Sequence, residues 1–275
     1  MSKGILYLIA TPIGNLEDVT FRAIRLLGSV SLIAAEDTRR TSKLLNRYKI
    51  VTPTISLHEH NEKQRTPSLI KRLEAGQSIA LVTDAGTPLL SDPGLHLVRT
   101  AVDRGVPIDP VPGASAILAA LAVSGLVKNE FTFLGFPPNR SSARKKWLGT
   151  LTSETRPLII FEAPHRLLGS LRDMAEVLGN RQVTVCREMT KVHQELVNGP
   201  ILYVLTQLHR PRGEFTIVVA PSNEPMPAVK NKNVLDYFGQ IAYSHSSKRE
   251  AIKEVAKKYG LKPGAIYKIL EENKP

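Results

Sequence analysis

Short apolar runs alternate with helix-like segments over roughly the first half of the chain. Apolar runs of strand length lie at residues 4–10, 31–36, 78–83 and 106–111. The segments between them repeat apolar residues every three to four positions, as helices do. This alternation is typical of a mostly parallel sheet covered by helices. We therefore predict an N-terminal α/β domain over residues 1–116.

Glycine, proline and threonine mark the expected ends of several helices in this domain. Thr66 and Pro67 suit the N-cap and first position of one helix, and Gly76 suits its end. Gly28 and Gly105 are expected to end two other helices in the same way.

The pattern of strands and helices restarts near Phe131. Strand-like runs follow at residues 131–136, 158–162, 182–187 and 214–220. Leucines recur every third position within residues 201–208, which favours a helix over a strand there. We predict a second α/β domain over residues 117–222.

Only helical patterns follow this second domain. Pro, Ser and Asn interrupt any period from residue 221 onward, and we assign residues 223–232 to a linker. Residues 233–275 are predicted to form a helix-turn-helix-like tail. Its contact with nucleic acid and its docking as a small helical bundle both remain open.

Three helices are expected in the tail. Asn233 is a possible N-cap of the first, and Ser247 with Glu250 forms a capping box that opens the second. Gly260 would end the second helix and residues 261–264 would form a tight turn. The third is expected over residues 265–271, with three side chains facing inward: Ile266, Tyr267 and Leu270.

The charge of the chain indicates a polyanionic partner. The formal net charge is +12 and the calculated pI is about 9.8. Residues 230–275 carry ten basic and five acidic side chains. The densest basic segment, RSSARKK, has no acidic neighbour and supplies four candidate RNA contacts: Arg140, Arg144, Lys145 and Lys146. The alternative is a solvated helix face.

Several common chemistries have no support in the sequence. The chain contains no G-x-G-x-x-G, no G-x-x-x-x-G-K-[ST], no C-x-x-C and no H-E-x-x-H, and its histidines lack metal-ligand spacing. We therefore predict no metal site. The single cysteine, Cys186, excludes an internal disulfide and is expected to be buried and inert. No apolar run has the length of a membrane span, so we expect a soluble, cytoplasmic protein.

Four short segments, three of which contain glycine, follow the predicted strands of the first domain. These are TPIGN, AEDTRR, TDAGTPLLSDPG and PGASA, beginning at residues 11, 35, 83 and 112. The carboxyl ends of parallel strands form the ligand crevice of an open sheet, so the four segments are expected to converge. Gly14, Gly86 and Gly113 permit close backbone approach, and Asp84 can accept hydrogen bonds or offset a cation. Taken singly, each segment also fits an ordinary turn.

These segments, together with LGFPP, FEAPHR, REMTKVHQE and GEFTIVV, resemble the ribosomal RNA small-subunit methyltransferase I family of the tetrapyrrole methylase superfamily. The resemblance covers residues 4 to about 220. It implies two α/β domains with S-adenosyl-L-methionine in the cleft between them, and a homodimer. It also implies methylation of the ribose 2′-hydroxyl of a cytidine in the decoding region of 16S ribosomal RNA, free or in the small subunit.

The resemblance places cofactor contacts at residues of both domains. The expected cofactor contacts are Ile13, Gly14, Asp84, Gly86, Thr87, Ser115, Ala116 and Phe161. The superfamily often has a glycine-rich turn after its first strand, whereas this chain has TPIGN, so the role of Pro12 stays open.

Methyl transfer to a ribose hydroxyl requires alignment of the reactants and removal of a proton. Polar side chains in the motifs supply six catalytic candidates: Glu36, Asp37, Arg39, Glu162, Lys191 and Glu195. The sequence does not choose among them, and each also suits a salt bridge or a helix cap. Two other functions remain: a methyltransferase acting on a tetrapyrrole or other small molecule, and a nucleic-acid-binding regulator that uses the tail.

Overall fold

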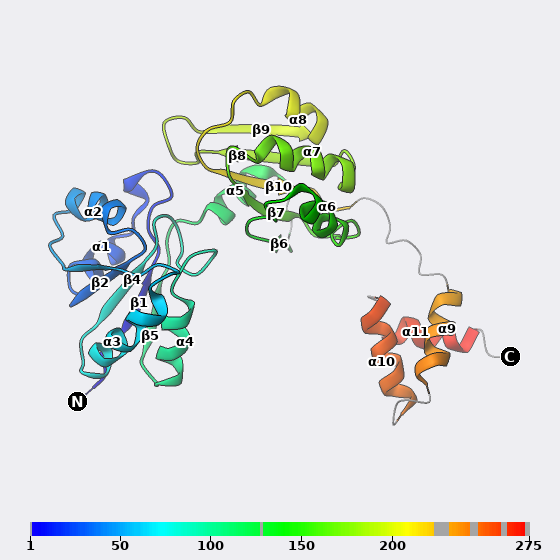
Figure 1. The fold of residues 1–275 in the computed structure, drawn as a ribbon, viewed down its shortest axis with the longest axis horizontal. Coiled ribbons are helices and arrows are strands. Elements are labelled where there is room, and N and C mark those ends of the chain that lie inside the picture. The colour runs from blue at the N-terminus through cyan, green and yellow to red at the C-terminus, as the bar shows by residue number, and fades with distance from the viewer. Residues whose placement is uncertain (1, 127–128, 223–230, 243–246, 260–262, 273–275) are drawn as a thin grey trace. The chain divides into compact units, whose positions relative to one another are not determined.

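A computed structural model describes residues 2–126, 129–222, 231–242, 247–259 and 263–272. The chain divides into two compact units, residues 1–221 and 222–275 (Figure 1). Within the first unit, two five-stranded sheets follow one another along the chain. No helix among the described residues is long and apolar enough to cross a membrane.

The first sheet is entirely parallel and has the order β3-β2-β4-β1-β5. Its strands are β1 (Leu6–Ile9), β2 (Leu32–Ala35), β3 (Thr54–Ser56), β4 (Ile79–Val82) and β5 (Ile108–Val111). The sequence predicted four of these strands but missed β3. This three-residue strand at the edge of the sheet is too short to establish an alternating pattern.

Helices cover both faces of the first sheet, so its central strands are buried and almost wholly apolar. The 3₁₀ helix η1 (Leu16–Asp18) leads into α1 (Phe21–Leu27), which packs with α2 (Thr38–Arg47) on one face. Helices α3 (Glu62–Glu74) and α4 (Leu95–Asp103) cover the other face.

Helix α3 begins earlier than the sequence predicted. Its N-cap is Asn61, so Pro67 lies inside the helix, and the Thr66 hydroxyl donates to the Glu62 carbonyl at 2.8 Å rather than capping the helix. The Glu62 carboxylate accepts hydrogen bonds from the His96 and Leu97 amides at the start of α4. This contact between distant segments holds the added turn, and no local signal reveals it.

The second sheet is mixed and has the order β6-β7-β10-β8-β9. Its strands are β6 (Thr132–Phe133), β7 (Leu158–Glu162), β8 (Gln182–Arg187), β9 (Glu195–Pro200) and β10 (Phe215–Val219). Only β6 and β7 pair in parallel. Strand β9 was not predicted because this edge strand ends in Gly-Pro and has no buried residue.

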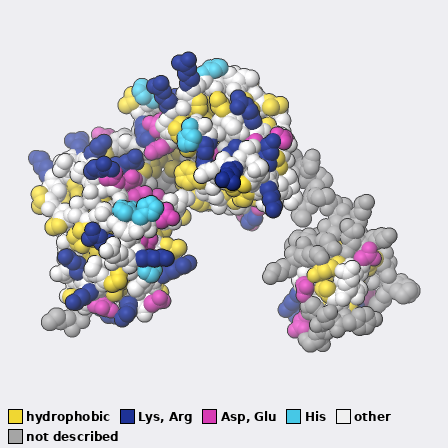
Figure 2. Space-filling view, viewed as in Figure 1, with side chains coloured by type: hydrophobic (Ala, Val, Ile, Leu, Met, Phe, Trp, Pro, Cys, Tyr) yellow, Lys and Arg dark blue, Asp and Glu magenta, His cyan; other side chains and the backbone are white. Residues whose placement is uncertain are grey.

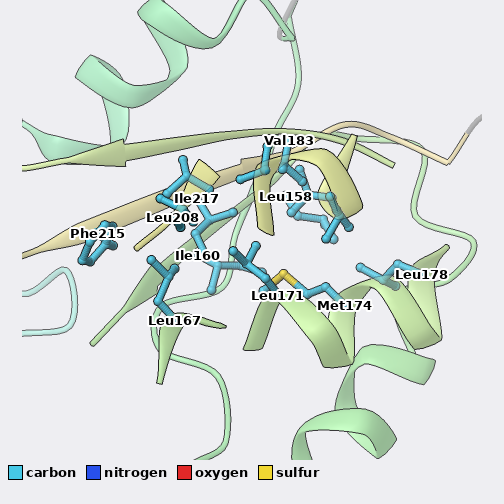
Figure 3. Packing of buried hydrophobic residues seen from close by; sticks show 14 of the residues in the cluster. Leu158, Ile160, Leu167, Leu171, Met174, Leu178, Val183, Leu208, Phe215 and Ile217 are labelled. Atoms are coloured by element: carbon cyan, nitrogen blue, oxygen red, sulfur yellow. The ribbon is translucent and has the colours of Figure 1, made fainter. Parts of the chain in front are cut away.

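Helices also cover both faces of the second sheet. Helices α6 (Ser141–Gly149), α7 (Leu167–Leu178) and α8 (Ile201–Gln207) pack on one face, where Leu171 and Met174 meet Ile160 and Ile217 (Figure 3). Helix α5 (Ala116–Ser124) packs on the other face. The helix predicted for residues 201–208 is confirmed.

The second unit contains α9 (Asn231–Ile241), α10 (Lys248–Tyr259) and α11 (Pro263–Glu272), which share an apolar core. The Glu250 amide donates to the Ser247 hydroxyl at 3.3 Å, as expected at a capped helix start. Asn233 lies inside α9 instead of capping it. The predicted helix end at Gly260 and the first half of the predicted turn, residues 261–262, lie outside the described residues. The second half of that turn is wrong, because Pro263 and Gly264 already belong to α11.

One of the three side chains expected to face inward on α11 does not. Ile266 and Leu270 are buried, but Tyr267 is 52% exposed, and the Lys248 ammonium lies 5.3 Å from the centre of its ring. Ile266 and Leu270 are four residues apart on one helix face, whereas Tyr267 is rotated about 100° from Ile266.

Candidate functional site

A cavity of about 470 Å³ opens in the first unit, where loops at one edge of each sheet meet. The first sheet contributes the segments after the carboxyl ends of β1, β2, β4 and β5. The second sheet contributes the ends of β7 and β8 and the start of β10, which runs antiparallel to both. Figure 2 shows acidic and hydrophobic side chains close together where these two halves face each other.

The cavity combines apolar walls with carboxylates. Its apolar walls are Ile13, Leu90, Ile117, Phe161, Met189 and Phe215, its carboxylates are Glu36, Asp84, Asp92, Glu162 and Glu214, and the half-exposed Phe136 lies at its rim. Its volume lies within the range of small-molecule pockets. Apolar and aromatic walls suit an adenine, and carboxylates suit a cation. The residues therefore fit S-adenosyl-L-methionine, which carries both groups.

Two glycines permit close contacts at the cavity for different reasons. Gly86 has a φ of +85° and exchanges two backbone hydrogen bonds with Thr11, at 2.9 and 3.0 Å. A Cβ at Gly14 would lie 2.5 Å from Cγ of Lys191, so no other residue lets the TPIGN loop approach the second domain this closely. Gly14 therefore holds two loops together and is not a lining residue.

Two carboxylates meet at the ends of β2 and β4. The Glu36 carboxylate accepts hydrogen bonds from the Thr83 hydroxyl at 2.7 Å and the Asp84 amide at 3.2 Å. The Asp84 carboxylate accepts the Asp37 amide at 3.0 Å and lies 3.3 Å from the Arg40 guanidinium. Burial raises the pKa of Asp84, and the charge of Glu36 raises it further.

Asp92 is a site residue to which the sequence assigned no role. Burial raises its pKa to about 6, although the Thr83 hydroxyl lowers it, and the charges of Glu36 and Asp84 add to the increase. A carboxyl with such a pKa can exchange protons near neutral pH. Asp92 lies within TDAGTPLLSDPG, so the signal was present in the motif.

Strained backbone flanks the cavity on both sides. Leu89 and Ser91 have φ values of +76° and +74°, while Glu188 and Thr190 have values of +47° and +66°. Each pair brackets a residue that lines the cavity, Leu90 in the first case and Met189 in the second. Non-glycine residues adopt this conformation at an energetic cost, and such strain gathers at functional sites.

Four of the six catalytic candidates lie off the cavity wall, and three of them, Asp37, Arg39 and Glu195, form surface ion pairs or caps. Asp37 caps α2 by accepting the Arg39 amide at 2.9 Å and also binds the Arg39 guanidinium, which holds the pKa of Asp37 down to about 2. Glu195, on the edge strand β9, pairs with Arg187 at 3.0 Å.

Lys191 joins two carboxylates beside the cavity without lining it. Its ammonium lies 2.9 Å from Glu188 and 2.8 Å from Glu214. Burial lowers the pKa of Lys191, but the hydrogen bonds to Glu214 and Glu188 outweigh this, so the pKa is raised. Lys191 is therefore cationic near neutral pH, which does not favour it as a base.

Glu36 and Glu162 are the catalytic candidates that line the cavity. The Glu162 carboxylate is held by the Arg166 guanidinium at 2.5 Å and by the Ser170 hydroxyl. It is 2% exposed, so its oxygen atoms are engaged inside the second domain.

The expected cofactor contacts gather at this cavity with one exception. Seven of the eight lie on its wall: Ile13, Asp84, Gly86, Thr87, Ser115, Ala116 and Phe161. Gly14 is the exception. Five further residues at the cavity were not predicted from the sequence, although all of them lie within quoted motifs: Leu90, Asp92, Phe136, Met189 and Glu214.

The basic segment at residues 140–146 forms the N-cap and first turns of α6 and contains two kinds of side chain. Arg144 is 5% exposed and pairs with Asp173 at 2.6 Å, so it supports the helix from inside. Lys145 pairs with Glu176 at 2.6 Å. Arg140 and Lys146 are exposed. Cys186 is buried, which raises its pKa to about 12 and matches the expected inert thiol.

The fold has solved neighbours of low sequence identity. Uroporphyrin-III C-methyl transferase from Thermus thermophilus, in complex with S-adenyl homocysteine, has a TM-score of 0.57 at 18% identity, over 79% of this chain and 97% of that chain. Diphthine synthase has a TM-score of 0.62 at 12% identity, over 79% and 90%. At these identities the comparisons establish the fold alone.

Sequence comparisons give a narrower assignment. The family described as Tetrapyrrole (Corrin/Porphyrin) Methylases matches residues 5–202. "Ribosomal RNA small subunit methyltransferase I" of Synechocystis sp. is 43% identical over 270 residues, 97% of each chain. The Bacillus subtilis protein of the same name is 49% identical over 222 residues, 80% of this chain and 76% of that protein. The chain therefore belongs to the tetrapyrrole methylase family, within the ribosomal RNA small subunit methyltransferase I group.

Proposed function

We propose that this methyltransferase transfers a methyl group from S-adenosyl-L-methionine to the ribose 2′-hydroxyl of a cytidine in the decoding region of 16S ribosomal RNA. The cavity at the meeting edges of the two sheets is the observation that carries this proposal, because its walls suit the cofactor and its rim is open to a large substrate. The names of the relatives support a ribosomal RNA substrate.

S-adenosyl-L-methionine supplies a methyl group activated by a positively charged sulfur, so the protein must mainly align the reactants and accept a proton. Asp84 and Glu36 offset the positive charge at the first sheet, and Ile13 and Phe161 provide apolar walls. Asp92 is the proton acceptor that we favour, since it lines the cavity and its raised pKa of about 6 makes it a better base than Asp37.

Helix α2 supplies a basic surface next to the cavity. Arg40 lines the cavity, and Arg39, Lys43 and Arg47 are exposed along the same helix, which has no acidic residue in its first turn. Positions 39, 40, 43 and 47 share one helix face. A row of cations leading to the site suits an RNA backbone. A tetrapyrrole would not need it, which weighs against the small-molecule alternative.

A methyl-transfer assay on small ribosomal subunits tests the proposal. Subunits from cells that lack this protein should accept labelled methyl groups, and mapping should find the label on one cytidine ribose. Methylation of a base, or of no RNA, would overturn it. We further propose a homodimer in the cytoplasm, where ribosomal substrates are available, and light scattering checks the dimer.

A further inference from the structure

Phe136 presents an aromatic ring at the rim of the cavity. The ring is 55% exposed and still lines the cavity. Its centroid lies 5.6 Å from that of Phe161, which in turn lies 5.0 Å from Phe133. Phe136 is therefore the outermost ring of an aromatic row that leads out of the site. A phenylalanine half open to water leaves apolar area that a ligand can cover.

The loop that carries Phe136 is fixed by two arginines whose carboxylate partners are buried. Arg144 donates to the carbonyl oxygens of Pro138 and Asn139, both at 3.2 Å, and Arg166 donates to the Asn139 side-chain oxygen. Asp173 forms an ion pair with Arg144, and Glu162 forms one with Arg166. Two of the residues that sequence analysis had assigned to RNA contact and catalysis, Arg144 and Glu162, thus belong to this support.

The same loop contacts the first domain. Gly135 has a φ of +65°, and a Cβ there would lie 3.2 Å from the Ser91 hydroxyl. The Phe161 amide donates to the Gly135 carbonyl at 2.9 Å. The backbone next to Phe136 is therefore held between the second sheet and the strained loop that carries Asp92. A ring on a backbone fixed in this way loses less freedom when a ligand covers it.

We infer that Phe136 is the stacking surface for the base of the target nucleotide. The inference rests on the proposed function. A ribose whose hydroxyl enters the cavity leaves its base next to the rim, because the 2′-carbon is bonded to the carbon that carries the base. Proteins read unpaired RNA bases by stacking them on aromatic rings, and enzymes that modify nucleotides take them out of the helix.

Variants of Phe136 test the inference in the full-length protein. We expect Phe136→Leu and Phe136→Ala to lower kcat/KM for methylation of under-modified small subunits by about 10- to 100-fold, the loss expected for one stacked base. Phe136→Tyr and Phe136→Trp should retain most of the activity. Calorimetric affinity for S-adenosyl-L-methionine should be unchanged in all four variants.

A matched control is Phe131→Ala, which removes a ring that is 38% exposed in the same domain but does not line the cavity. Its kcat/KM should match that of the wild-type protein. Wild-type kinetics for Phe136→Leu would overturn the inference. So would a parallel loss of cofactor affinity, because the ring would then be a wall of the cofactor site. A wild-type protein that methylates no RNA would instead overturn the proposed function.

Discussion

Two neighbours shift the pKa of the Asp84 carboxyl in opposite directions. The Arg40 guanidinium, 3.3 Å away, lowers this pKa, and the charge of Glu36 raises it. Arg40 therefore offsets only part of the negative charge at the ends of β2 and β4. The remaining negative charge faces the cavity, where a positively charged cofactor can neutralise it.

Cofactor affinity should depend on the charge of Asp84. We expect Asp84→Asn to weaken calorimetric binding of S-adenosyl-L-methionine by roughly 10- to 100-fold, because a charged hydrogen-bond acceptor is worth about 1.5–3 kcal/mol. Asp103→Asn, at the end of α4 and exposed, is the control. A folded Asp84→Asn protein with wild-type affinity would remove Asp84 from the cofactor site.

The rate of methyl transfer should rise with pH around the pKa of Asp92. If Asp92 accepts the proton, it must be ionised, so the rate increases as pH rises through about 6. Asp92→Asn should lose most of the turnover and keep its cofactor affinity. If this variant turns over normally, Glu36→Gln is the next variant to measure.

The ionised Asp92 carboxylate should lower the free energy of unfolding at neutral pH. Its folded pKa of about 6 lies above the usual aspartate value of 3.8, so the folded protein binds the proton more tightly. Stability therefore falls as pH rises from about 4 to 6. Asp92→Asn should be roughly 1–2 kcal/mol more stable than the wild type in denaturant unfolding at pH 8, allowing for partial solvent exposure. A stability difference that is the same at pH 4 and pH 8 would contradict this explanation.

Arg144 should contribute to stability. Arg144→Met removes the nearer ion-pair partner of the buried Asp173 carboxylate and leaves only Lys145, at 3.9 Å; loss of a buried partner typically costs about 3–5 kcal/mol. Denaturant unfolding should detect the loss. Lys146→Met, an exposed neighbour on α6, should change stability by less than about 0.5 kcal/mol. A stable Arg144→Met variant with weakened RNA binding would contradict this prediction and indicate that Arg144 contacts RNA.

RNA affinity should depend on salt through helix α2. Replacing Lys43 and Arg47 with Gln should flatten the plot of log affinity against log salt by about 0.7–0.9 for each lost phosphate contact. Lys71→Gln with Arg72→Gln is the matched control, since α3 covers the opposite face of the sheet. Equal slopes for both double variants would exclude α2 from the interface.

Removal of the tail should separate RNA docking from cofactor binding. Deleting residues 230–275 should preserve S-adenosyl-L-methionine affinity, because all the residues that line the cavity lie in the first compact unit. If the ten basic residues of this deleted segment contact phosphates, the salt slope of subunit binding should also flatten. Loss of cofactor binding, with the salt slope unchanged, would indicate a structural bundle.

The sequence by itself determined the order of most strands and helices and the motifs of the site. Runs such as Ile79–Val82 are apolar throughout because both faces of the strand are covered, and this pattern is visible locally. The motifs after β1, β2, β4 and β5 were expected to converge because parallel strands share one carboxyl edge. The cavity contains residues from each of them.

Tertiary structure decided what each polar side chain does. Arg144 and Lys146 are both basic residues of one segment, yet one is buried against Asp173 and the other is exposed. Likewise, Asp37 and Asp92 differ in pKa because Arg39 stabilises one charge and burial disfavours the other. Desolvation and partner distance depend on segments far apart in the chain, so local sequence carries no record of them.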